Sequence, residues 1–367
     1  MEAYLDNAAT TKPDNKVIKA AERAMMEYGN PSSLHERGLN AEDVLEDARK
    51  KVANSLGSNS EEVIFTSSGT ESDNQAILGT ALKSKKHIIT TSFEHHAVLD
   101  TCSWLGNNGY KVTYINPNKE GIINPDDIKK SITKDTIFVS VMHVNNEIGT
   151  IQPIKEIYEI CRNKEVIFHT DAVQSYKKEK LNSSMADLIS ISAHKVHGLK
   201  GTGALYIKEG IKLQPLMHGG MQEQGLRPGT ENLPGIAALG EASRLEMPVE
   251  NIRKLRDALA KNLLVIKGSK INGSMEKRIC SNLNMSFSGI GAENLMMHLS
   301  SMGISVSMGS ACVAKAIKPS HALKSIGLTE KEANGSIRMA LSKYTTKDEI
   351  DYASDKIKLV VESLRKV

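Results

Sequence analysis

Three clusters of polar residues follow short apolar runs, and each could do chemistry. The first covers residues 66–74 (TSSGTESDN), where small and hydroxylated side chains lead into a helical pattern. Free backbone N–H groups and the positive end of the helix dipole make such a start an anion site suited to phosphate. The alternative is a plain N-cap, in which Thr70 and Asp73 behave like a capping box.

The second cluster offers a carboxylate at the end of a strand. Residues 169–174 (HTDAVQ) follow the apolar run 166–168. Asp171 could hold a protonated ring nitrogen or a metal, or it could be a helix N-cap. His169 and Asp171 could both be metal ligands, but no third ligand at zinc-like spacing supports this, so no metal site is predicted.

The third cluster, residues 190–198 (SISAHKVHG), places Lys195 beside His and Ser just beyond an apolar strand. Desolvation lowers the pKa of an ammonium group, and the neutral amine can form a Schiff base. The alternative is an ordinary solvated lysine. A phosphate cradle, a strand-end Asp and a strand-end Lys are together what pyridoxal phosphate needs: an anion site, a partner for the pyridinium nitrogen and a lysine that binds the aldehyde.

These clusters need a scaffold that brings strand ends together, and residues 40–210 predict one. Apolar runs that are typical of strands alternate with amphipathic stretches that are typical of helices. The expected strands are 63–65, 87–90, 111–114, 136–141, 166–168, 188–190 and 204–207, and the expected helices are 41–56, 74–82, 97–105, 125–132 and 154–162. This alternation indicates an α/β fold with a mostly parallel sheet covered on both faces, which binds ligands at the carboxyl ends of its strands.

The rest of the chain and its composition limit the possible domain organisation and function. Residues 211–250 are punctuated by Gly and Pro, and a helical stretch from about residue 251 opens a second α+β region. The chain has 367 residues and a formal charge of +4 with the charges interspersed, which argues against direct nucleic-acid binding. No long apolar run predicts a membrane span, and the N-terminus lacks the pattern of a signal peptide. Four scattered cysteines fit the reducing cytoplasm.

Nine motifs follow one another in an order and spacing that resemble a known family. They are residues 5–11 (LDNAATT), 28–33 (YGNPSS), 65–74, 94–98 (EHHAV), 143–149 (HVNNEIG), 171–174 (DAVQ), 192–195 (SAHK), 227–230 (RPGT) and 309–312 (GSAC). Together they resemble the cysteine desulfurases of the NifS/IscS class, in the class V aminotransferase superfamily of fold-type I pyridoxal-phosphate enzymes. The resemblance implies a large cofactor domain with a seven-stranded-type sheet at 14–250, and a small domain of residues 1–13 and 251–367 that carries the cysteine loop.

The resemblance also implies roles for individual residues. Lys195 matches the lysine that holds pyridoxal 5'-phosphate, Asp171 the carboxylate on the pyridinium nitrogen, and His95 the histidine stacked on the ring, where it can shuttle protons. The remaining cofactor contacts match Gly69, Thr70, Ser192 and His194 at the phosphate, Gln174 and Asn146 at the phenolic oxygen and the substrate side, and Thr230 as a phosphate contact from the second subunit. A homodimer is therefore implied. The competing interpretation of His95 is a polar cap on the following helix.

Two residues of the C-terminal region complete the implied site. Arg338 matches the arginine that binds the substrate carboxylate, because a guanidinium donates two parallel hydrogen bonds. Cys312 matches the nucleophile, and it lies in a stretch of small residues that is a poor core segment. Cys102 and Cys161 lie on apolar helix faces and are expected in the core, while Cys280 is taken as structural.

The reaction implied is removal of sulfur from L-cysteine, which gives L-alanine and a persulfide on Cys312. The sulfur acceptor would be an iron–sulfur scaffold protein or a thiolation protein. A selenocysteine lyase and another class V enzyme such as an aminotransferase remain as alternatives. Departures from the family pattern are the basic stretch 313–318 after Cys312, Leu199 in place of a common proline, and Lys343 in place of a common arginine.

Overall fold

The computed structural model describes residues 1–81, 86–308 and 319–366. Its central element is a seven-stranded sheet in the order β2-β8-β7-β6-β5-β3-β4. The strands are β2 (Val63–Thr66), β3 (His87–Thr91), β4 (Lys111–Ile115), β5 (Thr136–Ser140), β6 (Ile167–Asp171), β7 (Leu188–Ser192) and β8 (Gly203–Ile207). Only β8 runs antiparallel to its neighbours, β2 and β7, so the expected mostly parallel α/β sheet is confirmed.

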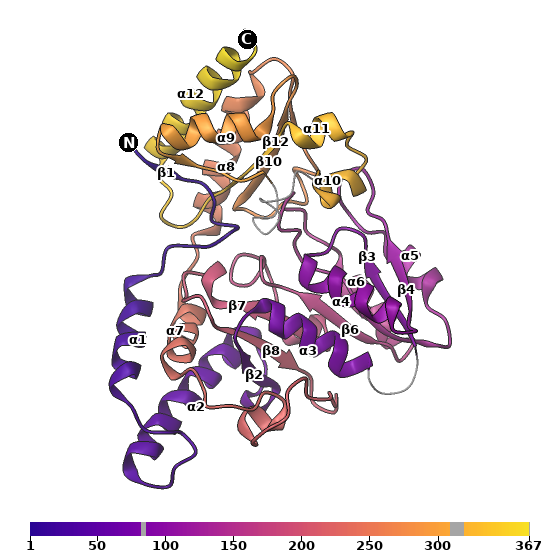
Figure 1. Ribbon diagram of the computed structural model, residues 1–367, viewed down its shortest axis with the longest axis vertical. Helices are drawn as coiled ribbons and strands as arrows, with labels where there is room; N and C mark the ends of the chain where they lie inside the picture. Colours follow the sequence, from indigo (N-terminus) through magenta and orange to yellow (C-terminus); the bar gives the residue numbers. More distant parts are fainter. Residues whose placement is uncertain (82–85, 309–318, 367) are drawn as a thin grey trace.

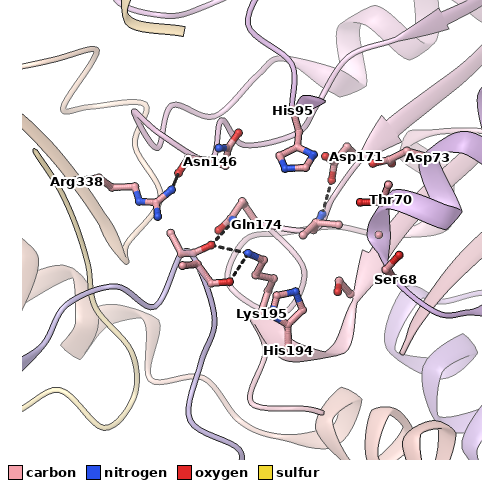
Figure 2. Close-up of a pocket in the computed structure, with 15 residues that line it drawn as sticks. Ser68, Thr70, Asp73, His95, Asn146, Asp171, Gln174, His194, Lys195 and Arg338 are labelled. Atoms are coloured by element: carbon pink, nitrogen blue, oxygen red, sulfur yellow. Dashed lines mark hydrogen bonds between the residues drawn. The ribbon is translucent and has the colours of Figure 1, made fainter. Parts of the chain in front are cut away.

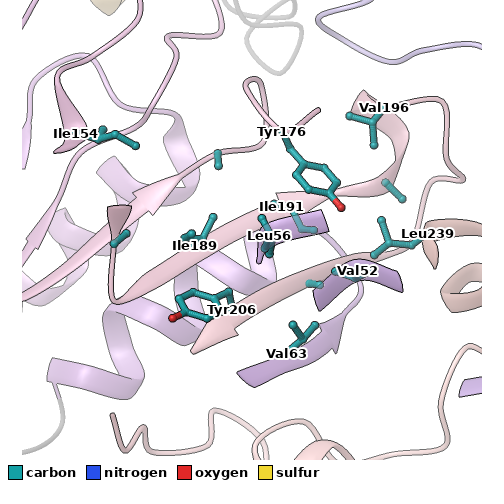
Figure 3. Close-up of a cluster of buried hydrophobic side chains, with 14 of the residues drawn as sticks. Val52, Leu56, Val63, Ile154, Tyr176, Ile189, Ile191, Val196, Tyr206 and Leu239 are labelled. Atoms are coloured by element: carbon teal, nitrogen blue, oxygen red, sulfur yellow. The ribbon is translucent and has the colours of Figure 1, made fainter. Parts of the chain in front are cut away.

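Helices cover this sheet on its two faces, as Figure 1 shows. They are α1 (Asn15–Met26), α2 (Glu36–Leu56), α3 (Gly69–Ala81), α4 (His96–Asn107), α5 (Pro125–Ser131), α6 (Ile154–Arg162) and α7 (Leu233–Arg244). Buried side chains of α2 and α7 pack on β2, β7 and β8, with Val52, Leu56 and Leu239 against Val63 and Ile191 (Figure 3). A separate apolar cluster, which includes Ala76, Val98 and Cys102, lies between α3, α4 and the sheet.

The C-terminal region builds a second core. Its helices are α8 (Val249–Leu264), α9 (Ala292–Ser301), α10 (His321–Ser325), α11 (Glu330–Asn334) and α12 (Lys347–Leu364). They accompany an antiparallel sheet of β9 (Ser269–Ile271), β10 (Asn282–Phe287) and β12 (Ser336–Ala340), while β1 (Ala3–Tyr4) pairs with β11 (Ile304–Ser305). Ala3 and Leu5 lie in this second core, so the start of the chain packs on its C-terminal region. The α+β character expected after residue 251 is thus confirmed, while the domain boundaries stay a prediction.

Several expected element bounds were wrong. α2 begins at Glu36 instead of residue 41, because the His35 side chain accepts a hydrogen bond from the Gly38 N–H and caps the helix there. The segment 211–250, for which the sequence showed only Gly and Pro punctuation, contains α7, which starts at an Asn232 cap with a proline in its first turn. The N-terminal helix α1 was not anticipated. It starts at the Asp14 cap and buries Val17, Ala20, Ala21 and Ala24.

Candidate active site

The carboxyl ends of the parallel strands open on a cavity of about 220 Å³. Figure 2 shows side chains from both halves of the chain around it. Its lining contains most of the residues singled out from the sequence: Gly69, Thr70, His95, Asn146, Asp171, Gln174, Ser192, His194, Lys195 and Arg338. The fold therefore brings together residues that are up to 269 positions apart, from Gly69 to Arg338.

At one end of the cavity, the turn from β2 into α3 presents backbone N–H groups. Ser68 caps this helix, because its hydroxyl accepts a hydrogen bond from the Glu71 N–H at 3.2 Å. The expected capping box of Thr70 and Asp73 was wrong, since Asp73 is buried against β6 and β7 instead. Thr70 is exposed, and its hydroxyl is not used in capping. A Cβ added at Gly69 would lie 2.5 Å from Cγ2 of Val173, so only glycine fits here.

Lys195 projects into the middle of the cavity from the short 3₁₀ turn Ala193–Lys195 that follows β7. Its Nζ donates hydrogen bonds to the carbonyl oxygens of Ala8 and Ala9, each at 2.7 Å. Burial, with help from the positive charges of Arg338 and Lys178, lowers the pKa of Lys195 to about 7. A large share of this amine is neutral near neutral pH, which is the form that attacks an aldehyde.

Two carboxyl groups lie deep in the cavity. Asp171 ends β6, and its Oδ1 accepts a hydrogen bond from the Val173 N–H at 2.8 Å, so it also caps the turn that follows. Burial raises the pKa of Asp171 to about 6, and it raises the pKa of Asp73 as well. Oδ1 of Asp73 lies 3.5 Å from Nε2 of His169 and has no hydrogen-bond partner among the described residues. Burial lowers the pKa of His169 to about 3, so the two do not form an ion pair.

His95 is both a helix cap and a member of the cavity wall. Its Nδ1 accepts a hydrogen bond from the Ala97 N–H at 3.1 Å at the start of α4. Burial lowers the pKa of His95 to about 4, with the charge of Lys195 acting in the same direction. The ring is therefore neutral, and because Nδ1 accepts the Ala97 N–H, the ring proton lies on Nε2, which is a hydrogen-bond donor.

Arg338 enters the cavity from β12 and is 2% exposed. Its Nη1 donates to the carbonyl oxygen of Asn146 at 3.0 Å, and its Nη2 pairs with Oδ1 of Asp6 at 2.9 Å. Its Nε is buried and has no hydrogen-bond partner within the described part of the chain. The guanidinium is thus held in place by two contacts, one at each terminal nitrogen.

The segment 6–10 was not recognised from the sequence as a direct contact of these side chains. Besides holding Lys195 and Arg338, it accepts a hydrogen bond from Gln174 Nε2 at Ala8 O, 3.0 Å away. Thr10 Oγ1 lies 3.2 Å from Nδ1 of His194. Most of these contacts use backbone carbonyls, which carry no side-chain signal in the sequence. The motif at residues 5–11 was the only indication.

Two expected site residues do not appear among the described residues that line the cavity. Thr230 is exposed and does not line it. Cys312 lies outside the described residues. The other three cysteines, Cys102, Cys161 and Cys280, are buried and unpaired, as expected of structural thiols. Burial raises the pKa values of Cys102 and Cys161 to about 12, which keeps both thiols protonated and unreactive.

The residues present fit pyridoxal phosphate. The Gly69 turn offers a cradle that a Cβ would fill, a lysine amine with a lowered pKa lies in reach of the same space, and a buried carboxyl group lies behind it. The guanidinium-bearing side chain of Arg338 lines the same cavity and suits a carboxylate. Among the described residues, no group of three His, Cys, Asp or Glu side chains is arranged to hold a metal ion. No helix in the same ranges is long and apolar enough to span a membrane.

Comparison with known proteins agrees with this geometry. The model of the class-V aminotransferase family matches residues 3–353, and the chain belongs to that family. Cysteine desulfurase IscS of Dictyoglomus turgidum is 44% identical over 100% of this chain and 96% of its own length, and that of Mannheimia succiniciproducens is 46% identical over 99% and 93%. Within the family, the chain is thus a member of the cysteine desulfurases.

Solved structures give the same result for the fold. A NifS-like protein superposes with a TM-score of 0.92 at 38% identity, covering 99% of this chain and 100% of the other. A structure described as SspA in complex with cysteine superposes with a TM-score of 0.85 at 35% identity, covering 94% of this chain and 100% of the other. The seven-stranded sheet and the smaller antiparallel sheet are therefore those of a NifS-like enzyme.

Proposed function

We propose that this enzyme uses pyridoxal 5'-phosphate to remove sulfur from L-cysteine, releasing L-alanine and carrying the sulfur as a persulfide on Cys312. The observation that carries the proposal is the meeting of the Lys195 amine, the Asp171 carboxyl group and the Gly69 turn around one cavity that Arg338 also reaches. When bound, the cofactor supplies an electron sink for the α-carbon of an amino acid. The residues of the chain supply the binding groups, the orientation and the proton transfers.

Each residue has a task that follows from its position. Gly69, Thr70, Ser192 and His194 hold the phosphate, Asp171 holds the proton on the ring nitrogen, and Gln174 contacts the phenolic oxygen. Lys195 binds the cofactor and, once free, takes the α-proton with its neutral amine. Arg338 binds the substrate carboxylate beside Asn146, since both residues line the cavity. His95, which lines the same cavity, is the proposed proton shuttle beside the cofactor ring.

The sulfur transfer is a displacement at sulfur. The Cys312 thiolate attacks the substrate sulfur, and the S–S bond forms as the substrate C–S bond breaks. The electron pair of the C–S bond stays with the substrate carbon, which takes up a proton before alanine leaves. The persulfide then passes its outer sulfur to an acceptor protein, for which we propose an iron–sulfur scaffold or a thiolation protein. We further propose a homodimer in which Thr230 contacts the partner's phosphate, and a cytoplasmic setting that keeps thiols reduced.

One assay tests this function. The purified protein should be yellow, and L-cysteine with a thiol reductant should give sulfide and alanine in equal amounts. Cys312→Ala should abolish sulfide release and keep the colour, while Lys195→Ala should lose the ordinary cofactor linkage. Requirement for a keto acid would instead indicate an aminotransferase. A Cys312→Ala variant that still turns over selenocysteine, but not cysteine, would indicate a selenocysteine lyase.

A further inference from the structure

A second lysine lies behind the catalytic one and is not used by the mechanism above. Lys178 ends the turn that follows β6, the same turn that carries Asp171 and Gln174. It is 8% exposed, and its Nζ donates to the backbone carbonyl oxygen of Lys195 at 3.4 Å. The side chain therefore reaches the main chain of the residue that binds the cofactor.

The burial of the Lys178 ammonium group is not explained by a gain in the stability of the fold. Buried lysines are rare, and those that occur are normally paired with a carboxylate. Within the described ranges, Lys178 forms no ion pair with a carboxylate, and the hydrogen bond of its Nζ is the long contact to the Lys195 carbonyl oxygen. The nearest sulfur, Sγ of Cys280, contacts the backbone of Lys178 at 4.0 Å. A neutral apolar side chain would be less costly at this position.

The buried position of Lys178 is explained by its effect on the protonation of Lys195. A positive charge near an amine disfavours a second positive charge, which is a known way to activate a catalytic lysine. Burial lowers the pKa of Lys178 to about 8, above the value of about 7 for Lys195. At neutral pH the proton therefore stays mainly on Lys178. The hydrogen bonds from Lys195 Nζ to Ala8 and Ala9 favour the charged form, while burial and then the charges of Arg338 and Lys178 lower the pKa of Lys195.

The charge of Lys178 acts within a defined set of neighbours. The charged and titratable groups that face Lys195 are Arg338, Lys178, Asp6, Asp171, His95 and His194. Those that face Lys178 are Lys195, His194, His197 and Cys280. Burial lowers the pKa values of His194 and His197 to about 4 and raises that of Cys280, so these three groups are uncharged at pH 7. Lys178 and Arg338 are then the cations next to the Lys195 amine.

We propose that Lys178 is a positioning residue for Lys195: it holds the Lys195 main chain through the carbonyl oxygen, and its charge adds to burial and to Arg338 in favouring the neutral, nucleophilic form of the neighbouring amine. This inference rests on the proposed role of Lys195 in binding the cofactor. It makes the turn 171–178 a single unit that supplies the ring-nitrogen carboxylate, the phenolic-oxygen contact and the charge that activates the lysine.

The test measures the protonation of Lys195 without using turnover. Full-length protein freed of cofactor is acylated with a trace of acetic anhydride between pH 5 and 10, and the labelling of Lys195 is read by peptide mass spectrometry. Lys178→Met and Lys178→Gln should both move the labelling midpoint of Lys195 upward. A shift of one pKa unit from 7 lowers the neutral fraction at pH 7 about fivefold. Lys178→Arg should keep the midpoint of the wild type, as should Lys180→Met at an exposed position of the same segment.

A second measurement separates charge from packing. The rate at which added pyridoxal phosphate turns yellow on the protein at pH 7 should fall about fivefold in both uncharged variants and recover at pH 9. The Lys178→Gln variant keeps a hydrogen-bond donor for the Lys195 carbonyl oxygen. If Lys178→Met does not fold, Lys178→Gln still provides the test. An unshifted Lys195 midpoint in folded Lys178→Gln would overturn the inference. If the wild type forms no bond between pyridoxal phosphate and Lys195, the proposed function fails instead, and the labelling result still decides the role of Lys178.

Discussion

Arg338 has two of its guanidinium nitrogens already engaged, one by Asp6 and one by the Asn146 carbonyl. Its orientation is therefore fixed before a substrate arrives, and little side-chain entropy remains to be lost on binding. A lysine at the same place would supply charge without the rigid fork that places donors on three sides. Recognition of the substrate carboxylate should depend on this geometry rather than on charge alone.

We expect Arg338→Lys to raise the KM for L-cysteine tenfold or more, since a lost charge-assisted hydrogen bond is worth about 1.5–3 kcal/mol. The yellow colour should remain, because the cofactor contacts are elsewhere in the cavity. Steady-state kinetics measure the effect, with Arg365→Lys, at an exposed arginine near the C-terminus, as the control. A KM within twofold of the wild type would contradict the assignment of Arg338 to the substrate.

The lowered pKa of Lys195 also affects the stability of the cofactor-free protein. In the folded state the pKa is about 7, while in the unfolded chain it is near the ordinary value of about 10.4. Between these values the unfolded state binds more protons, so the free energy of unfolding rises with pH. Lys195→Met removes this contribution. We expect the variant to gain stability relative to the wild type as the pH falls from 10 to 7, by at most about 1.4 kcal/mol per pH unit.

Urea unfolding of the two cofactor-free proteins at several pH values measures this difference. Groups common to both proteins, such as Asp171 and Glu94, contribute similarly to both curves. Equal slopes against pH would mean that Lys195 is protonated to the same extent in both states, and that the site does not activate it.

At the scale of elements, the start of α3 is the part of the cavity most sensitive to one methyl group. The hypothetical Cβ of residue 69 would lie 2.5 Å from Val173 Cγ2 and 3.6 Å from Ser192 Cβ, so a larger residue must push β7 or the Asp171 turn away. We expect Gly69→Ala to weaken pyridoxal-phosphate binding at least tenfold and to cost about 1–3 kcal/mol in stability. Titration with the cofactor, followed by absorbance, measures the change in binding. Urea unfolding measures the change in stability.

Gly106→Ala is the matched control for that change. Gly106 lies in α4, where an added Cβ would meet only Val112 Cγ2 at 3.9 Å, an ordinary contact. Alanine is the better helix former, so this variant should be as stable as the wild type or more stable. Unaltered cofactor binding in Gly69→Ala would show that the phosphate is held elsewhere.

The elements themselves show what the sequence could and could not predict. The run 136–141 was enough to predict β5, because a buried parallel strand needs apolar side chains on both faces. The β-branched and aromatic residues of 111–114 were enough to predict β4, which is a more exposed edge strand. The direction of β8 could not be predicted, since antiparallel pairing with β2 and β7 depends on the path of the chain and not on local pattern. α1 was missed because its buried face is mostly alanine, which gives a weak apolar signal.

The residues of the candidate site also fall into those that the sequence predicted and those that only the structure revealed. Residues with distinctive side chains in motifs, such as Lys195, Asp171 and Arg338, were found from the sequence and do meet at one cavity. Asp73 was assigned to a cap, because its contact with His169 on β6 joins positions nearly one hundred residues apart. The carbonyls of Ala8 and Ala9 are common to every sequence and became visible only when the structure placed them at Lys195 Nζ.

At the scale of the whole molecule, apolar side chains are exposed around the junction of α1 and α2. Leu34 is 94% exposed, Tyr28 76% and Met26 75%. Pro31 and Ser32 of the same junction line one hollow together with Met221 and Glu231, so the segment that contains Thr230 lies beside it. Adjacent apolar side chains this exposed are typical of a surface that a partner covers. A second copy seated there would bring Thr230 toward another subunit, in agreement with the proposed homodimer.

We expect the wild type to sediment as a dimer and Leu34→Glu to weaken dimerisation at least tenfold, because a charge would be buried in an apolar contact. If Thr230 holds the partner's phosphate, the monomeric variant should also lose pyridoxal phosphate more readily on dilution. Leu359→Glu is the control, since Leu359 is 52% exposed on α12, a helix of the C-terminal region away from this junction. Sedimentation velocity with absorbance of the bound cofactor reports both quantities at once. A Leu34→Glu variant that stays dimeric would place the interface elsewhere, and a monomer that keeps its cofactor as tightly as the dimer would remove Thr230 from the phosphate site.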